Sequence, residues 1–238
     1  MVMGPLVGAH AQDRNVSPVV VELFTSQGCS SCPPADAFLR ELANRNDIIA
    51  LTLPIDYWDN LGWPDTFAAP AHTSRQRTYA KRLPNLRVYT PQMVVNGRLD
   101  IVGSHKEEVL AAIDAEAAAG QSFVDIDIAS EGNTLTITLG AAPSDKANVT
   151  ADVWIVPYHE GAQSVAIEAG ENQGRIIDYA NVVDGLMKLG EYRGKRTAYR
   201  HSIQVLIDKS ITGCVVLVQE ENNGPIIGAK RIVLDTIL

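Results

Sequence analysis

Cysteine is scarce in this sequence, with three residues in 238: Cys29, Cys32 and Cys214. Three cysteines are too few for a small disulfide scaffold, and no second Cys-x-x-Cys pair is present to complete a four-ligand zinc site. Long apolar runs are also missing. No stretch approaches the roughly 20 apolar residues that a transmembrane helix requires, so we expect no membrane span.

Positive charge is in deficit as well. The chain has 20 Lys and Arg residues against 28 Asp and Glu residues, and a formal net charge of −8. Such a protein repels polyanions, so we expect no nucleic-acid partner. The 46% hydrophobic and 20% charged content is typical of a globular protein and argues against disorder. The length predicts two domains of about 100 to 120 residues each.

The N-terminus has the features of a targeting segment. MVMGPLVGAHA is mostly apolar and ends in Ala9-His10-Ala11, a small-x-small pattern that signal peptidase recognises. No basic segment precedes it, so we interpret residues 1–17 as the remnant of an export signal, with a disordered arm as the alternative. The sequence therefore predicts a periplasmic or secreted protein.

Residues 18–120 alternate between strands and helices. β-Branched apolar runs at 19–24 and 48–53 predict strands that are buried on both faces of a parallel sheet. Between them, apolar residues recur at helical spacing, with Asp36, Arg40 and Glu41 on the opposite face. A second helix is expected over about 74–83. Asn96-Gly97 between two short apolar runs predicts a β-hairpin. Ser104 and Glu107 form a predicted capping box for a helix over 105–119 that ends at Gly120.

Residues 121–238 have a different pattern, in which apolar and polar residues alternate. Strands are expected at 123–128, 135–139, 150–156, 200–207, 214–219 and 226–235. We therefore predict a mainly antiparallel, sandwich-like β domain. Cys214 alternates with Val216 and Val218, so it is expected to be a buried, inert thiol.

The stretch FTSQGCSSCPPADAFLREL places Cys29 and Cys32 where the first strand passes into the first helix. Backbone N–H groups and the helix dipole favour a thiolate at such a junction. Cys29 is nearer the exposed junction, so we expect it to be the nucleophile and Cys32 to be the resolving thiol. Pro33 and Pro34 suit the first helical turn, where an N–H has no partner inside the helix.

The order of elements from 18 to 120 resembles the thioredoxin-like superfamily over every element. This resemblance implies that Thr90-Pro91 is a cis peptide bond facing the disulfide. It also implies a buried acid close to Glu22 that assists proton transfer at the resolving cysteine, and a salt-bridged structural carboxylate is the alternative. Asp56 and Trp58 follow the second strand, where ligands bind at the edge of a parallel sheet. They form either a wall of the cysteine site or a simple packed loop.

A narrower resemblance covers nearly the whole chain. The segments VELFTSQGCSSCPPAD, DYWDNLGWPD, YTPQMVVNG and GENQGR are similar to a bacterial family of predicted secreted proteins, the domain of unknown function numbered twelve twenty-three. The family resemblance implies a thioredoxin-like domain joined to a β-rich domain, with no established substrate. If GENQGR folds toward the cysteines, Glu171 and Arg175 orient a partner; a bare surface turn with a salt bridge is the favoured interpretation.

Three functions are compatible with this pattern. The first is a thiol–disulfide oxidoreductase that needs no cofactor beyond its own cysteine pair and acts on a protein or small-molecule thiol or disulfide. The second is a binding module that presents a groove beside Pro91 to an extended peptide and uses the pair as a structural disulfide. The third is a copper(I) carrier, which is disfavoured because no methionine or histidine accompanies the two thiolates. The substrate and the oligomeric state are left open.

Overall fold

The computed structural model describes residues 17–204 and 211–232. The predicted export signal lies outside these residues, as do parts of the strands expected at 200–207 and 226–235. No helix within the described ranges is long and apolar enough to cross a membrane.

The first half has the predicted order of strands and helices. Its elements are β1 (Val19–Thr25), α1 (Pro33–Ala43), β2 (Ile48–Pro54), the short helix η1 (Asp59–Leu61), α2 (Pro70–Ala80), β3 (Gln92–Val95), β4 (Leu99–Val102) and α3 (Lys106–Ala119). The turn between β3 and β4 is formed by Asn96 and Gly97, which both have positive φ angles. The predicted hairpin is therefore confirmed.

The second half is made almost entirely of strands. They are β5 (Ile126–Glu131), β6 (Thr134–Leu139), β7 (Ala151–Ala166), β8 (Ile176–Val183), β9 (Met187–Tyr192), β10 (Thr197–Ser202), β11 (Gly213–Glu220) and β12 (Ile226–Ile232), with the short helix η2 (Ser144–Lys146). These strands pair with one another in antiparallel fashion. The predicted antiparallel β character of this half is confirmed.

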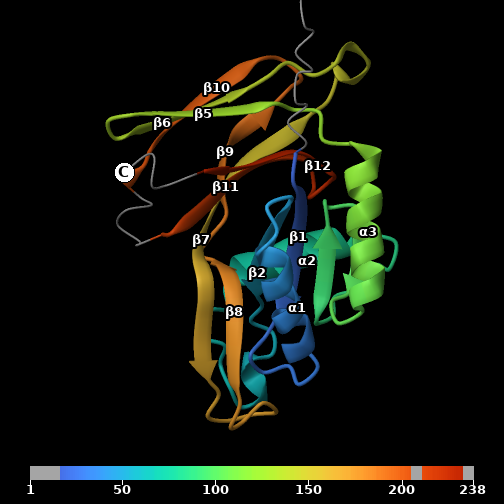
Figure 1. The fold of residues 1–238 in the computed structure, drawn as a ribbon, viewed down its shortest axis with the longest axis vertical. Helices are drawn as coiled ribbons and strands as arrows, with labels where there is room; N and C mark the ends of the chain where they lie inside the picture. The colour runs from blue at the N-terminus through green and yellow to red at the C-terminus, as the bar shows by residue number, and fades with distance from the viewer. Residues whose placement is uncertain (1–16, 205–210, 233–238) are drawn as a thin grey trace, which may run out of the picture.

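One nine-stranded sheet runs through both halves, in the order β12-β11-β7-β8-β2-β1-β3-β4, with β9 paired to β7 (Figure 1). β1 and β2 are parallel, and β1 and β3 are antiparallel. The two halves join where β8 pairs with β2 at Thr52 and Val182. β10, β6 and β5 form a separate three-stranded sheet. A division into two domains at residue 120 stays a prediction.

Apolar side chains form separate clusters on the faces of the large sheet. One cluster lies under α1 and α3 and includes Phe38, Leu39 and Val109. A second combines β1 and β2 with Tyr79 of α2 and with β7 and β11. A third is shared by the three-stranded sheet and strands β7, β11 and β12. Each fully buried Leu, Ile or Val side chain contributes about 1.5 to 3 kcal/mol, so these clusters hold the elements together.

Three local predictions require correction. α3 begins at Lys106 with His105 as its N-cap and has no side-chain cap, so the predicted capping box of Ser104 and Glu107 is wrong. α2 begins at Pro70 rather than near residue 74, because proline suits the first helical position. Asp36 is 2% exposed and faces the protein interior, although the helical pattern placed it with the polar residues of α1.

Candidate functional site at the Cys29–Cys32 disulfide

Cys29 and Cys32 form a disulfide in the turn that leads into α1, with their Cα atoms 5.4 Å apart. The Cys32 N–H donates to the Cys29 carbonyl at 3.1 Å, which closes the turn. Cys32 is the N-cap residue, and Pro33 and Pro34 follow it at the start of the helix. Proline lacks an N–H, and the first helical positions have no partner for one, so this sequence starts a helix without loss of a hydrogen bond.

The two sulfur-bearing residues are almost completely buried. Cys29 is 1% exposed and Cys32 is 0% exposed, whereas Ser30 and Ser31 between them are exposed. The expectation that Cys29 lies at an exposed junction is therefore wrong. The side chain of Ser31 lies close by, with its Oγ 3.4 Å from the Cys29 Sγ. At 1% exposure, Cys29 offers very little surface to a thiol reagent in this conformation.

Trp58 and Thr90 lie together beside the disulfide turn. The Trp58 Nε1–H donates to the Thr90 Oγ1 at 3.0 Å. A methyl group placed on Gly28 would lie 3.5 Å from the Trp58 Cβ. The Thr90-Pro91 peptide bond is cis, as the resemblance to thioredoxin-like proteins implied. Trp58 is thus close to Gly28, which precedes Cys29, and is hydrogen-bonded to Thr90, which precedes Pro91.

Pro91 is linked to the first turn of α1 through Gly103. The Pro91 carbonyl accepts the Gly103 N–H at 3.0 Å. A Cβ on Gly103 would lie 3.0 Å from the Cβ of Ala35, so the two backbones approach closely. This contact chain brings the Pro91 segment next to the start of the helix that carries Cys32.

A loop from the second half binds the disulfide turn directly. Asn172 is fully buried, and its Nδ2 donates to the carbonyls of Gln27 and Cys29, each at 2.9 Å. The Ser30 N–H donates to the Glu171 carboxylate at 3.3 Å. Figure 1 shows the β7–β8 loop at the same lower end of the molecule as the turn between β1 and α1. The favoured interpretation of this segment as a bare surface turn is therefore wrong, and the sequence contained no sign that Asn172 would be buried.

Two buried carboxyls lie close to this turn, and neither was predicted as a site residue. Asp36 accepts a hydrogen bond from Thr25 Oγ1 at 2.7 Å, and burial raises the pKa of its carboxyl to about 8. Asp65 accepts the Gln27 N–H at 2.8 Å, and burial raises its pKa to about 6. Burial and the two carboxyls raise the pKa of Tyr179 on β8. The Asp36 Oδ2 and the Tyr179 hydroxyl have no hydrogen-bond partner among the described residues.

Glu22 has the contacts of a structural carboxylate. The Arg75 guanidinium donates to its two carboxylate oxygens at 2.6 and 3.0 Å, and both side chains are almost fully buried. Gln219 of β11 accepts a further hydrogen bond from Arg75 at 2.9 Å. These partners match the salt-bridged alternative and tie α2 to the second half. Asp56 is bonded to α2 as well, because its Oδ1 accepts the Thr73 hydroxyl at 2.6 Å.

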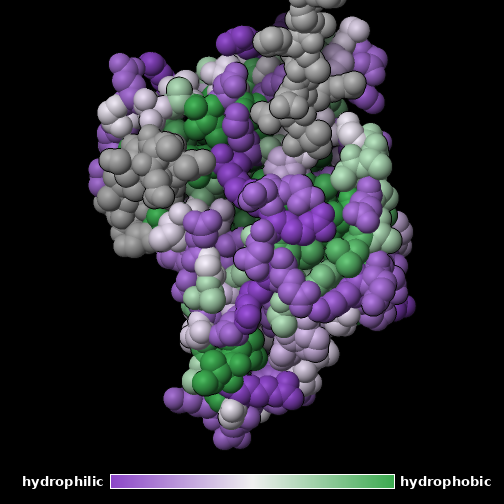
Figure 2. All heavy atoms as spheres, viewed as in Figure 1, coloured by the Kyte–Doolittle hydropathy of each residue, from purple (hydrophilic) through white to green (hydrophobic). Residues whose placement is uncertain are grey.

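The remaining candidate groups are inert or scattered. Cys214 is 0% exposed, and burial raises the pKa of its thiol to about 12, so the predicted burial is confirmed. No group of three or more His, Cys, Asp or Glu side chains within 17–204 and 211–232 is placed to hold a metal ion. Figure 2 shows mixed polar and apolar residues over the visible face. Among the residues that the structure describes, the large apolar residue with the highest exposed fraction is Ile176 at 74%, at the start of β8.

Comparisons with known proteins give a family and two structural neighbours. A family model described as "Protein of unknown function (DUF1223)" matches residues 20–219. A crystal structure of protein AGR_C_4864 from Agrobacterium tumefaciens is 32% identical, covers 90% of this chain and 93% of its own, and has a TM-score of 0.77. HBP35 of Porphyromonas gingivalis is 15% identical over 93% of this chain and 76% of its own, with a TM-score of 0.60, so it is similar in fold alone. No curated protein matches the sequence.

Proposed function

This chain belongs to the DUF1223 family, whose description assigns no activity, and we propose that it is a thiol–disulfide oxidoreductase with a thioredoxin-like first half. The observation that carries this proposal is the disulfide at the start of α1, and it is supported by the cis Thr90-Pro91 bond and by the hydrogen bond between Trp58 and Thr90. The parallel β1–β2 pair and the antiparallel β3–β4 hairpin support the fold assignment. A disulfide forms and persists in oxidising compartments, which supports export from the cytoplasm.

The proposed reaction is thiol–disulfide exchange. In the reduced protein the Cys29 thiolate attacks one sulfur of a substrate disulfide, and the other substrate sulfur leaves as a thiolate that takes up a proton. The Cys32 thiolate then attacks the Cys29 sulfur and displaces the second substrate thiolate. The substrate disulfide becomes two thiols, and the protein dithiol becomes the Cys29–Cys32 disulfide. The same steps in reverse oxidise a substrate dithiol.

Cys29 is assigned the attacking role because of its surroundings. Both cysteines are almost fully buried, and each adjoins an exposed serine, so the feature that distinguishes Cys29 is its contact with the Ser31 hydroxyl. The helix dipole contributes only about 0.3 to 1 kcal/mol to a thiolate at this position. Pro33 and Pro34 supply no N–H donors, and the N–H groups of Ala35 and Asp36 already donate to the Cys32 carbonyl. The Ser31 hydroxyl, 3.4 Å from the Cys29 sulfur, is the side-chain donor in place to stabilise the thiolate.

The test is the equilibrium of the purified protein with glutathione buffers, together with the variant Cys29→Ser. We expect a reduction potential between about −120 and −270 mV, the range of working oxidoreductases, and loss of all disulfide exchange in the variant. Cys214→Ala is the control, since it removes a thiol that lies outside the site. A potential below about −300 mV would show that the pair is a structural disulfide and would reject the proposal.

The burial of Cys29 favours a second candidate function. With 1% of Cys29 exposed, the disulfide is shielded from thiol reagents, as expected of a structural disulfide in a peptide-binding module. In that case the protein binds an extended peptide beside Pro91, and binding is the same in the oxidised wild type and in Cys29→Ser. Peptide binding with no measurable exchange would favour this second function.

A further inference from the structure

The nine-residue connection between β7 and β8 is built as a clamp on the disulfide turn. This clamp loop, residues 167–175, is closed by hydrogen bonds from the Ile167 N–H to the Arg175 carbonyl and from the Gly174 N–H to the Ile167 carbonyl. Arg175 also donates to the Asn172 Oδ1 at 3.0 Å, so the carboxamide of Asn172 is fixed in orientation. Both of its donated hydrogen bonds go to the turn that holds Cys29.

We propose that the clamp loop controls the reactivity of Cys29: Asn172 holds the Cys29 turn in its closed position, and the Glu171 carboxylate disfavours the Cys29 thiolate. Both are positioning residues, and the inference rests on the proposed exchange reaction. It assigns a role in the chemistry of the first half to a segment that the β-rich half supplies.

The part played by Asn172 follows from burial. Its side chain is 0% exposed and bonds the carbonyls of Gln27 and Cys29. The Cys29 carbonyl also accepts the Cys32 N–H, so removal of this carboxamide costs that carbonyl one of two donors, whereas for the Gln27 carbonyl it removes the side-chain donor. The lost hydrogen bonds penalise the closed turn relative to an open one in which water can reach these carbonyls. The Cys29 sulfur then becomes accessible more often. A partner that displaces the clamp loop gains the same access.

The part played by Glu171 follows from charge and distance. Its carboxylate accepts the Ser30 N–H, and that nitrogen is bonded to the carbonyl carbon of Cys29. Covalent geometry therefore keeps the carboxylate within about 8 Å of the Cys29 sulfur. Even with the dielectric constant of bulk water, two negative charges at this distance repel by enough to change the thiolate fraction about two- to threefold.

Other charges face the same turn and set the background against which Glu171 acts. The Arg175 guanidinium, held on Asn172, favours a thiolate, while Asp65 on the Gln27 N–H opposes one. Asp36 in the first turn of α1 is largely protonated at neutral pH, because burial raises its pKa to about 8. Replacement of Glu171 by Gln leaves all of these groups in place and keeps an acceptor for the Ser30 N–H.

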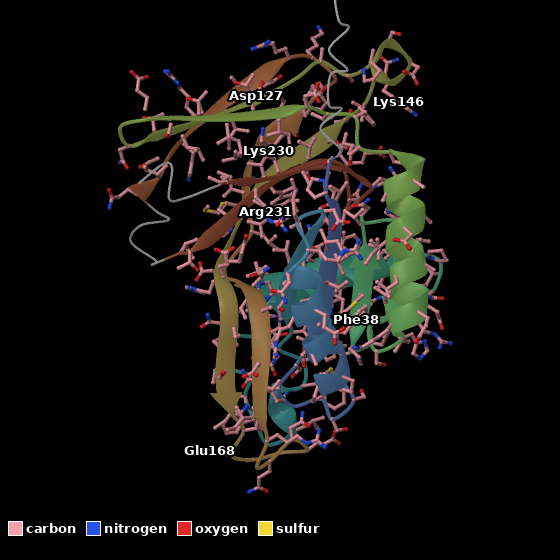
Figure 3. The ribbon with its side chains drawn as sticks, in the orientation of Figure 1. Phe38, Asp127, Lys146, Glu168, Lys230 and Arg231 are labelled. Atoms are coloured by element: carbon pink, nitrogen blue, oxygen red, sulfur yellow. A yellow bond between two sulfur atoms is a disulfide. The ribbon has the colours of Figure 1, made fainter. Side chains whose placement is uncertain are left out.

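The first test compares Glu171→Gln with Glu168→Gln, which removes an equal charge from the same loop. Glu168 is exposed and lies at the lower end of the molecule (Figure 3). The readout is the iodoacetamide alkylation rate of Cys29 in the fully reduced full-length protein at pH 7. We expect Glu171→Gln to react about threefold faster than wild type, Glu168→Gln to be unchanged, and 0.5 M salt to reduce the difference. Equal rates for Glu171→Gln and wild type would overturn the electrostatic part.

The second test measures the rate at which dithiothreitol reduces the disulfide in Asn172→Ala. We expect a rate at least fivefold above wild type, with near-native circular dichroism as the control for folding. If this variant fails to fold, Asn172→Ser, which retains one donor, takes its place with a smaller rise. A folded variant that is reduced no faster than wild type would overturn the positioning role.

The two proposals can fail independently. If the variants behave as expected but wild type has the reduction potential of a structural disulfide, the control of Cys29 by the clamp loop is supported and the exchange function is rejected. If wild type exchanges disulfides with a reduction potential in the range of working oxidoreductases but neither variant changes a rate, the control by the clamp loop is rejected and the exchange function is supported.

Discussion

Three acidic side chains around the first strand and helix have similar chemistry but different partners. Glu22 is held by the guanidinium of Arg75, so its charge is compensated in the interior. Asp65 accepts backbone N–H groups, which offset part of the cost of its burial. Among the described residues, Asp36 has one hydrogen-bond partner, the hydroxyl of Thr25, and the effect of burial on its pKa outweighs that of this hydrogen bond. These contacts, rather than the residue types, decide which carboxyl stays protonated.

Asp36 predicts a pH dependence of stability. Burial raises the pKa of its carboxyl in the folded state from 3.8 to about 8. Between about pH 4 and pH 8 the unfolded chain loses this proton while the folded protein keeps it, so the free energy of unfolding falls as pH rises and levels off above pH 8. Asp36→Asn imitates the protonated carboxyl and should be more stable than wild type at pH 8 by about 2 kcal/mol or more, since each pKa unit is worth about 1.4 kcal/mol.

Urea unfolding at pH 5 and pH 8 measures this effect. Asp47→Asn is the matched control, because Asp47 is an exposed acid and its removal leaves the slope of stability against pH unchanged. If Asp36→Asn has the same pH dependence as wild type, the Asp36 carboxyl is ionised in the folded protein, and its assignment as a protonated group is wrong.

Among the elements, the β3–β4 hairpin illustrates how a local signal also serves a tertiary contact. Its turn residues Asn96 and Gly97 adopt positive φ angles of 47° and 65°. The same turn contacts the start of β12 in the second half, because the Ile226 N–H donates to the Asn96 carbonyl at 2.9 Å. A Cβ on Gly97 would collide with the backbone carbonyl of Gly224. Gly97 is thus required twice, once for its backbone angle and once for close approach.

Two glycine substitutions separate these requirements. Gly132 also has a positive φ angle, of 55°, but a Cβ there meets no atom within 4 Å. Gly132→Ala should cost about 1 kcal/mol of stability for the backbone angle alone. Gly97→Ala should cost at least about 2 kcal/mol more, because the backbone of the β11–β12 turn must shift. Denaturant titration of both variants measures the difference, and equal costs would show that the contact with Gly224 is unimportant.

At the scale of the whole molecule, the two halves share a sheet and a core. Leu51 and Leu53 of β2 belong to the same buried cluster as Val156 of β7 and Leu217 of β11. The Thr52 hydroxyl donates to the Ala180 carbonyl, and Arg40 of α1 forms an ion pair with Asp178 of β8 at 2.7 Å. Separation of the halves would expose this apolar surface to water.

The shared core predicts that the chain unfolds in one cooperative step. Trp58 and Trp63 report on the first half, and Trp154 on β7 reports on the second. Urea unfolding of wild type and of Trp154→Phe is followed by tryptophan fluorescence and by far-ultraviolet circular dichroism. In each protein we expect the two signals to change with the same midpoint. Tryptophan fluorescence of Trp154→Phe that changes at a different urea concentration from its circular dichroism would show that the halves unfold independently.

The sequence by itself was sufficient for features that depend on local interactions. It determined the order of elements in the first half, the Asn96-Gly97 turn, the cis bond before Pro91 and the burial of Cys214, because each follows from turn chemistry, periodicity or family resemblance.

The tertiary structure alone decided which groups surround the disulfide and how exposed it is. Asn172 and Glu171 are separated from Cys29 by more than 140 residues of chain, and no periodicity links positions so far apart. The burial of Asp36 and the pairing of Glu22 with Arg75 depend in the same way on packing against distant elements. Burial and electrostatics are properties of the assembled fold, so they became known only when elements distant in the sequence were placed against one another.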